Sequence, residues 1–158
     1  MYVTDYLRPA NVAFDDGAES KVAVLRRLVE ILASSGATTN PEDCLSALLE
    51  RERLMTTGVG KGVALPHAFS ASAPETVIAY LRLSDGVEFD AVDGKPVNHI
   101  FCMLGPPDAQ GRHLKILARL ARLINSAGFT DALSAAADPE SLLATFREQE
   151  EALQPHPG

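Results

Sequence analysis

The sequence predicts an α/β or α+β sandwich in which helices cover both faces of a mixed β-sheet. Helical patterning fills the first part of the chain, strand-like apolar runs occupy the middle, and helical patterning returns toward the end. With 158 residues and 46% apolar composition, the chain has the length of one domain and enough apolar residues for an ordinary core. We therefore assign residues 1–150 to one domain and residues 151–158 to a polar, frayed tail.

Two helices are predicted before the glycine-rich middle of the chain. The first runs from Ser20 to Gly36, where glycine suits the left-handed turn that ends a helix. The second begins at Asn40-Pro41, which has the composition of an N-cap and first helical residue, and it ends near Met55. Their inward positions are leucines and valines at helical spacing.

Three apolar runs predict the strands. Gly62–Pro66 is too short for a helix, and proline cannot donate to a sheet ladder, so we expect His67 where this strand gives way to a loop. Thr76–Leu83 has strand-like composition and precedes a turn at Ser84-Asp85-Gly86. Val97–Leu104 is almost entirely apolar, which is typical of a central strand.

Three more helices are expected after the strands. Helical spacing covers Arg112–Ser126, a short helix follows over Phe129–Ala137, and Asp138-Pro139 marks the start of the last one. That helix extends through Phe146, and the polar residues from Arg147 onward are predicted to fray.

Charge and cysteine content exclude several classes of function. A net charge of −7 opposes binding to a nucleic-acid backbone. Cys44 and Cys102 belong to no close-spaced ligand pair, and the histidines lack a ligand-spaced carboxylate, so we expect reduced thiols, no metal site and no cofactor. With neither a leader pattern nor a membrane-length apolar run, the protein is expected to be soluble and cytoplasmic.

The glycine-rich stretch Thr57–Gly62 matches neither common nucleotide-binding motif. No glycine lies five positions before Gly60, as a P-loop requires, and the dinucleotide fingerprint needs a different spacing after a strand. The backbone at Thr57, Gly58 and Gly60 has little steric cover, so its amides are candidates for binding a phosphate. A tight turn from helix to strand explains the same glycines without any ligand.

Three side chains are candidates for chemistry. The imidazole of His67 can be neutral near pH 7 and accept a phosphoryl group, although a histidine after proline is commonly a plain loop residue. His113 lies near a helix start, where it either binds a phosphoryl oxygen or caps the helix. Arg51 either reaches the same oxygens or pairs with Glu50 or Glu52 on the surface. His99, inside an apolar strand, is interpreted as a satisfied core histidine.

Together, the stretch from Arg51 through TTGVGKGVALPH, the segment FDAVDGKPV and the helix HLKILARLARL resemble the enzyme IIA family of the bacterial phosphotransferase system. The similar branch is the fructose/mannitol type, which includes nitrogen-regulatory IIA proteins, and the resemblance covers about Ser20 to Phe146. It implies a three-layer α/β/α sandwich and a phosphocarrier that is phosphorylated by HPr or by its nitrogen-branch counterpart.

The resemblance also implies roles for individual residues. His67 matches the phosphoryl-accepting histidine, expected to use Nε2, and His113 and Arg51 match the second histidine and the arginine beside it. Thr57 and the glycine turn match the segment that flanks the pocket. Ala68 departs from the glycine frequent at its position, and Phe69-Ser70 replace positions that are often basic or polar, which bears on partner specificity.

Two functions are consistent with this resemblance. In the first, phosphorylation at His67 signals to regulatory partners, as the nitrogen-regulatory branch implies. In the alternative, the chain passes the phosphoryl group to a IIB cysteine for uptake of a fructose- or mannitol-type sugar, with the IIB and membrane IIC parts on separate proteins. The similarity of RERLMTTGVGKG and FDAVDG to the nitrogen-branch pattern favours the first. A domain with the fold and an inactive site is the third interpretation, and the intact set of two histidines and an arginine argues against it.

Overall fold

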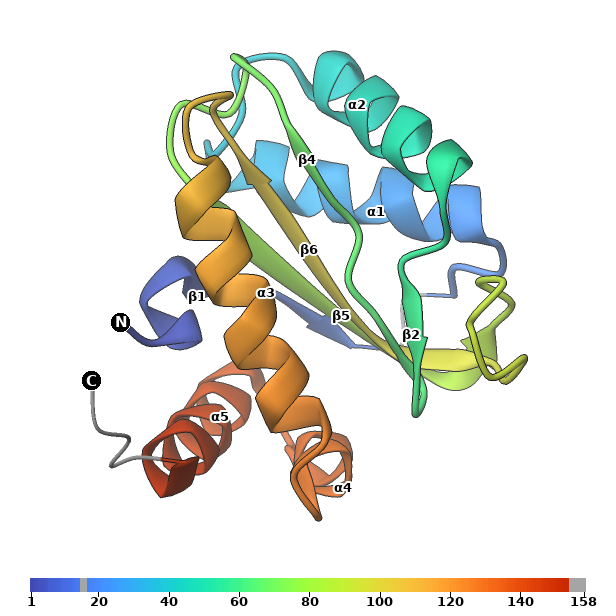
Figure 1. Cartoon of the computed structure of the whole chain (residues 1–158), viewed down its shortest axis with the longest axis vertical. Coiled ribbons are helices and arrows are strands. Elements are labelled where there is room, and N and C mark those ends of the chain that lie inside the picture. Colours follow the sequence, from blue (N-terminus) through green and yellow to red (C-terminus); the bar gives the residue numbers. More distant parts are fainter. Residues whose placement is uncertain (15–16, 154–158) are drawn as a thin grey trace.

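The structure, a computed structural model, describes residues 1–14 and 17–153, in which a mixed sheet is enclosed by helices (Figure 1). This confirms the predicted α/β sandwich. The elements are, in chain order, the 3₁₀ helix η1 (Val3–Tyr6), β1 (Leu7–Phe14), α1 (Lys21–Ser34), α2 (Pro41–Leu54), β2 (Gly58–Gly60), β3 (Val63–Ala64), β4 (His67–Phe69), β5 (Val77–Val87), β6 (Val97–Gly105), α3 (Gln110–Ile124), α4 (Phe129–Ala135) and α5 (Pro139–Leu153).

The described strands form one six-stranded sheet in the order β1-β5-β6-β3-β2, with β4 paired to β6 further along the same edge as β3. β5 and β6 run antiparallel at the centre, whereas β1 is parallel to β5, and β3 and β4 are parallel to β6. The central position predicted for Val97–Leu104 is confirmed, because this segment is β6 and is buried almost throughout.

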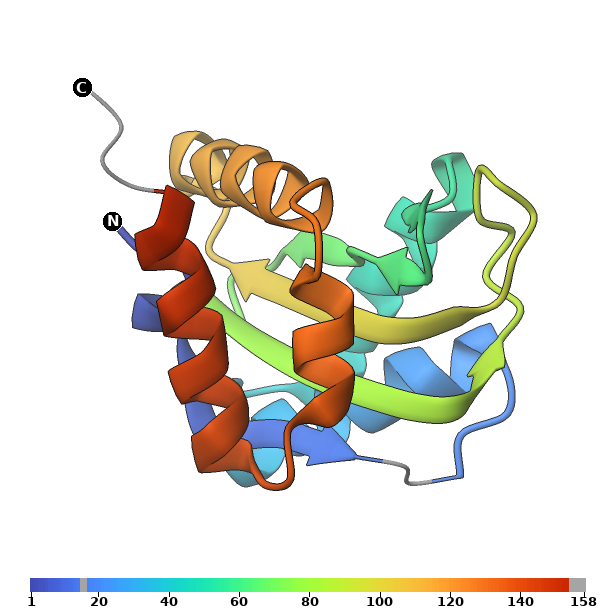
Figure 2. The ribbon, with the colours of Figure 1, turned by 90° about the horizontal axis from the view of Figure 1, so that it is seen from below.

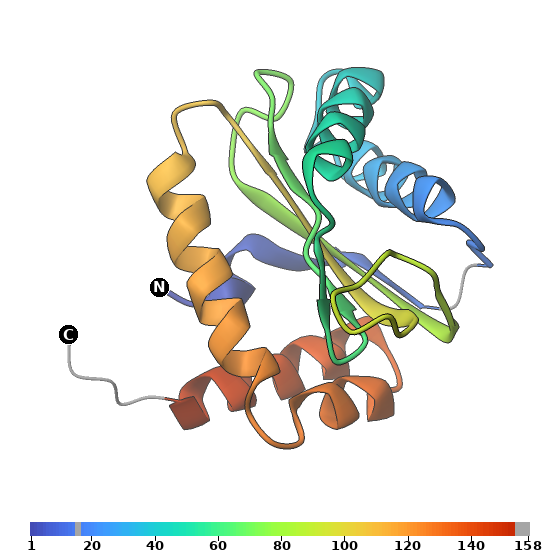
Figure 3. The same ribbon diagram turned by 45° about the vertical axis from the view of Figure 1, so that its right-hand side comes forward.

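Helices cover both faces of the sheet and create two separate apolar cores. α1 and α2 pack on one face, while η1, α3, α4 and α5 pack on the other (Figure 3). Seen from below, α4 and α5 lie side by side across the sheet (Figure 2). The side chains of a strand alternate between the two cores, which explains why β6 is apolar at nearly every position.

The predicted starts of the first two helices are confirmed by their caps. The side chain of Ser20 accepts a hydrogen bond from the amide of Ala23, and that of Asn40 accepts one from Asp43. Pro41 occupies the first turn of α2, where its missing N–H costs no hydrogen bond. No helix in the described ranges is long and apolar enough to cross a membrane.

Three strand predictions were incomplete. No strand was expected near the N-terminus, yet β1 is present as an edge strand stabilised by its pairing with β5. The turn expected at Ser84-Asp85-Gly86 is instead part of β5, which continues to Val87 through a shift of register against β6. His67 does not begin a loop: Pro66 interrupts the ladder between β3 and β4, and pairing resumes at His67 opposite Met103.

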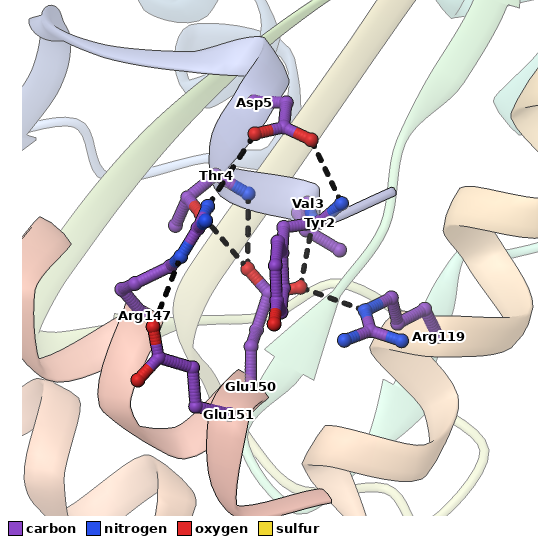
Figure 4. Close-up of polar contacts among 8 residues, drawn as sticks. All are labelled: Tyr2, Val3, Thr4, Asp5, Arg119, Arg147, Glu150 and Glu151. Carbon is purple, nitrogen blue, oxygen red and sulfur yellow. Dashed lines mark hydrogen bonds and ion pairs between the residues drawn. The ribbon is translucent and has the colours of Figure 1, made fainter. Parts of the chain in front are cut away.

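The expectation of a fraying segment from Arg147 onward is wrong for Arg147–Leu153, which complete α5, while residues 154–158 lie outside the described residues. The reason is a buried carboxylate. Glu150 accepts hydrogen bonds from the backbone amides of Val3 (2.7 Å) and Thr4 (3.0 Å) and from Nε of Arg119 (2.8 Å) (Figure 4). The amides and the guanidinium compensate for burying this charge, so the polar end of α5 is fastened to η1 and α3.

Candidate functional site

The site lies at the edge of the sheet where β4 runs beside the C-terminal half of α2. An open pocket of about 370 Å³ is formed there by residues of both elements: Ala47, Glu50, Arg51, Leu54, His67, Ala68 and Phe69. The structure thus brings together two of the predicted residues, His67 and Arg51, which are sixteen positions apart in the sequence. Leu54 and Met55, both 69% exposed, lie at the end of α2 next to this pocket.

The ring of His67 is held in one orientation by its own backbone neighbourhood. Nδ1 lies 2.7 Å from the carbonyl oxygen of Leu65, and because a carbonyl can only accept, Nδ1 carries the proton. The remaining nitrogen, Nε2, therefore has a free lone pair. Burial is the main cause that lowers the pKa of His67. The hydrogen bond to Leu65 and the charge of Glu52 oppose this shift, and the charge of Arg51 adds to it. The imidazole is consequently neutral and nucleophilic at pH 7.

Arg51 is not paired with either neighbouring glutamate, which were the alternatives for a surface role. Its Nη1 donates to the carbonyl oxygen of Met55 at 3.0 Å, and within the described ranges its guanidinium makes no ion pair. Glu50 pairs with Arg53 instead, and Glu52 points to Thr57. The guanidinium therefore keeps most of its donors available beside His67.

Thr57 is buried, and its polar groups already have partners. Its hydroxyl donates to Oε1 of Glu52 at 2.6 Å and its amide donates to Oε2 at 2.9 Å, while Lys21 binds the same carboxylate at 3.0 Å. This buried clamp ties the turn after α2 to the start of α1. The role of Glu52 was missed from the sequence, since only its nearness to Thr57 could have indicated it.

Gly58 and Gly60 lie away from the pocket. A Cβ at Gly58 would meet Cα of Ala91 at 2.8 Å, so this glycine permits a close approach of two backbone segments. Gly60 pairs with Val63, whose partner on β6 is His99, whereas the partner of His67 is Met103. Four residues along a strand correspond to about 13 Å. The structure therefore places these two glycines in the short strand β2, packed against residues 91–93, and neither lines the pocket of His67.

His113 lies in the first turn of α3 but does not cap it at the surface. It is 1% exposed, and its ring stacks on Phe69 with centroids 4.6 Å apart. Neither ring nitrogen has a hydrogen-bond partner among the described residues. Burial, with a smaller effect from the charge of His67, lowers the pKa of His113 to about 4. Phe69 links the histidines, because it also lines the pocket that contains His67.

His99 confirms the interpretation as a satisfied core histidine. Its Nδ1 is 2.7 Å from the hydroxyl of Tyr80, and its Nε2 is 3.2 Å from that of Ser134. A polar cavity of about 420 Å³ beside it is larger than the pocket at His67. Arg82 lines this cavity, but its guanidinium donates to carbonyl oxygens at the end of α4 and is less available to a ligand. The larger cavity is therefore not the better candidate for the site. His156 lies outside the described residues.

The described side chains include no group of three His, Cys, Asp or Glu residues that could hold a metal ion. Cys44 and Cys102 are buried and unpaired thiols, and burial strongly raises the pKa of Cys102. The chemistry available at the pocket is thus that of a neutral imidazole beside a guanidinium. Such a pair suits transfer of an anionic group to nitrogen, because the guanidinium can neutralise the incoming charge.

The fold and site define an α/β sandwich domain that has, at the edge of its sheet, a histidine with a free Nε2 lone pair beside an arginine. The sequence model described as "Phosphoenolpyruvate-dependent sugar phosphotransferase system, EIIA 2" matches residues 5–149. The chain belongs to this EIIA family, as the resemblance predicted.

Individual relatives agree with this assignment. The chain is 33% identical over 144 residues to a nitrogen regulatory protein of Bradyrhizobium diazoefficiens, covering 90% of this chain and 92% of that protein. It is 32% identical over 124 residues to the fructose-specific EIIABC component of Bacillus subtilis, covering 78% of this chain but only 20% of that protein. The crystal structure of the nitrogen regulatory protein IIA-Ntr from Neisseria meningitidis superimposes with a TM-score of 0.85 at 30% identity, covering 91% and 98% of the two chains.

Proposed function

We propose that the protein is a phosphocarrier that accepts a phosphoryl group on Nε2 of His67 from a histidine-phosphorylated carrier of the HPr type, and that its phosphorylation state regulates partner proteins. The observation that carries this proposal is the hydrogen bond from Nδ1 of His67 to the carbonyl of Leu65. It fixes the neutral tautomer with a free lone pair on Nε2, in a pocket that also contains the guanidinium of Arg51.

The transfer step is a displacement at phosphorus. The lone pair of Nε2 forms the new N–P bond while the N–P bond of the donor's phosphohistidine breaks, and the donor's nitrogen keeps that electron pair. The ring of His67 gains positive charge as it attacks, and the carbonyl of Leu65 stabilises it through the Nδ1 proton. Arg51 neutralises charge on the phosphoryl oxygens.

His113 is proposed to donate a hydrogen bond to the phosphoryl group, the role that the family resemblance implies. Its two buried nitrogens, which have no partner in the described part of the chain, support this role because they leave the ring with unused hydrogen-bonding capacity. Its ring stacks on Phe69, which also lines the pocket that contains His67. Thr57 takes part through its clamp to Glu52, which orders the chain between Arg51 and His67, and Gly58 and Gly60 are not assigned to the phosphate.

The regulatory role is favoured over a sugar-specific one by the extent of the matches. The match to a nitrogen regulatory protein extends over 144 residues, and a nitrogen regulatory IIA-Ntr structure superimposes with a TM-score of 0.85, whereas the matches to fructose-specific components extend over 111 and 124 residues. A phosphoryl group on His67 adds concentrated negative charge to the pocket, which changes the partners that the surface attracts. The alternative, transfer onward to a IIB cysteine, requires a second protein, since Cys102 is fully buried and its raised pKa keeps it protonated.

The test is phosphorylation in a reconstituted system. The protein is incubated with phosphoenolpyruvate, enzyme I and an HPr-type carrier, and its intact mass is measured. We expect wild type and His99→Gln to gain one phosphoryl group, and His67→Gln to gain none while keeping its fold by circular dichroism. An unmodified wild-type mass with both a sugar-branch and a nitrogen-branch carrier would overturn the proposal. Adding a IIB protein then tests the alternative, because onward transfer removes the label from His67.

A further inference from the structure

A row of three residues crosses the sheet directly beneath His113. Phe69 on β4 pairs with Gly105 on β6, and on the other side of β6 the rung next to Val77–Leu104 sets Thr76 opposite Gly105. Neighbouring residues of one row point to the same face, here the face covered by α3. The ring of His113 therefore rests over a glycine, with an aromatic ring on one side and a hydroxyl on the other.

Gly105 is the floor of this arrangement. A Cβ at this position would lie 2.4 Å from Nε2 of His113 and 3.0 Å from Oγ1 of Thr76. The first distance is shorter than real Cβ contacts allow and the second is tighter than most of them, so the ring and the hydroxyl occupy the space that a side chain would fill. Nε2 and Oγ1 consequently approach the same point above the backbone.

These two atoms share a second property. Oγ1 of Thr76 and both ring nitrogens of His113 are buried and have no hydrogen-bond partner within residues 1–14 and 17–153. A buried polar atom without a partner costs about 1–3 kcal/mol, and such atoms rarely occur side by side by chance. A hydroxyl can donate and an imidazole nitrogen can accept, so one hydrogen bond between them would satisfy both atoms.

We propose that Thr76 is a positioning residue for His113: its hydroxyl donates a hydrogen bond to Nε2 and thereby places the single ring proton on Nδ1. A small movement of the ring or of the threonine side chain forms this bond. The stacking on Phe69 holds the ring plane, while the threonine decides which nitrogen carries the proton.

The position of that proton decides what His113 can do. Because the pKa of His113 is about 4, the ring is neutral at pH 7 and has one N–H. With the proton on Nδ1, the ring offers a donor on the side away from Gly105. With the proton on Nε2, it would instead offer a lone pair there, which repels phosphoryl oxygens. The inference rests on the proposed function for its catalytic consequence, but the tautomer is a property of the resting protein.

The first experiment reads the tautomer by ¹H–¹⁵N correlation spectra of the histidine rings at pH 7. We expect wild type to carry the His113 proton on Nδ1, Thr76→Val to shift it toward Nε2, the form that free histidine favours, and Thr76→Ser to restore it. Thr130→Val, in the first turn of α4, is the matched control and should leave the spectrum of His113 unchanged. An Nε2–H tautomer in wild type, or an unchanged tautomer in Thr76→Val, would overturn the proposal.

The second experiment measures the rate of phosphorylation of the same variants. We expect Thr76→Val to be about tenfold slower, the effect of one misplaced hydrogen bond, with Thr76→Ser near the wild-type rate. Equal rates for wild type and Thr76→Val would overturn the positioning role. If wild type is never phosphorylated while the tautomer still follows residue 76, the proposed function fails and the pairing of Thr76 with His113 is supported.

Discussion

His99 and His113 lie on the same side of the sheet and look alike by the usual criteria. Both are buried, at 4% and 1% exposure, and burial lowers the pKa of each to about 4. They differ in their hydrogen bonds. Both nitrogens of His99 are bonded, to Tyr80 and Ser134, whereas those of His113 have no partner in the described ranges.

This difference separates a histidine with a structural role from the one that we propose to bind the phosphoryl group. A perturbed pKa is common to both, so it does not identify the active site by itself. A buried ring nitrogen without a hydrogen-bond partner is more informative, because an apolar side chain would fill the same space without that cost. His99 stabilises the junction of the sheet with α4, while His113 keeps at least Nδ1 without a hydrogen-bond partner among the described residues.

The largest expected effect concerns phosphoryl transfer. His113→Leu should slow phosphorylation by about 10²–10³-fold, as for loss of one preorganised donor to a developing charge. His99→Leu should leave the rate unchanged, since this ring lies beside β3 and α4, remote from His67. Rates are measured by rapid-quench sampling and intact mass. A comparable slowing in both variants would mean that the comparison reflects stability and not chemistry.

The next effect is on acid stability. Each histidine has a folded-state pKa of about 4 against an ordinary value of 6.5, so the unfolded chain binds protons first as the pH falls. The contribution of each neutral ring to the free energy of unfolding is therefore fully present above pH 6.5. It is lost as the pH falls toward 4, by on the order of 3 kcal/mol for each histidine. The free energy of unfolding is measured with urea at several pH values. In either His99→Leu or His113→Leu, the loss between pH 6.5 and pH 4 that comes from these two histidines should be about half as large as in wild type. An unchanged pH dependence in both variants would contradict the assigned pKa values.

The smallest effect distinguishes the two residues at neutral pH. His99→Leu should lower the free energy of unfolding by about 2 kcal/mol, because the hydroxyls of Tyr80 and Ser134 lose their bonds to the ring. His113→Leu should cost less, because only Nε2 of this ring is proposed to be bonded, to Thr76, and the variant also removes Nδ1, which has no partner among the described residues. The double variant Tyr80→Phe, His99→Leu should recover part of the loss. Equal destabilisation by both single variants would show that both ring nitrogens of His113 are bonded in solution.

The parts of the fold that could be predicted have local causes. Ser20, Asn40 and Pro41 cap α1 and α2 through contacts within one turn, and the apolar run of β6 follows from its burial on both faces. β1 could not be predicted, because Arg8, Pro9 and Ala10 are exposed and interrupt any alternating pattern, and only pairing with β5 makes the segment a strand.

The site shows the same division. His67 and Arg51 could be named from motifs in this sequence, but the hydrogen bond that sets the tautomer of His67 depends on how the chain turns at Pro66. Glycines with a turn-forming pattern were expected near the phosphate, and the structure uses them to pack residues 91–93. The burial of His113 against Phe69 depends on α3 packing over β4 and β6, which are distant in the sequence, so no local pattern could predict it.

The carboxylate of Glu150 joins the first turn of the chain to its last helix across 147 sequence positions. During synthesis, the amides of Val3 and Thr4 emerge from the ribosome long before the side chain that will accept them. A nascent chain halted anywhere before α5 therefore exposes the open flank of β1 and η1. This flank is covered only after the residues of α5 have left the ribosome and folded against it.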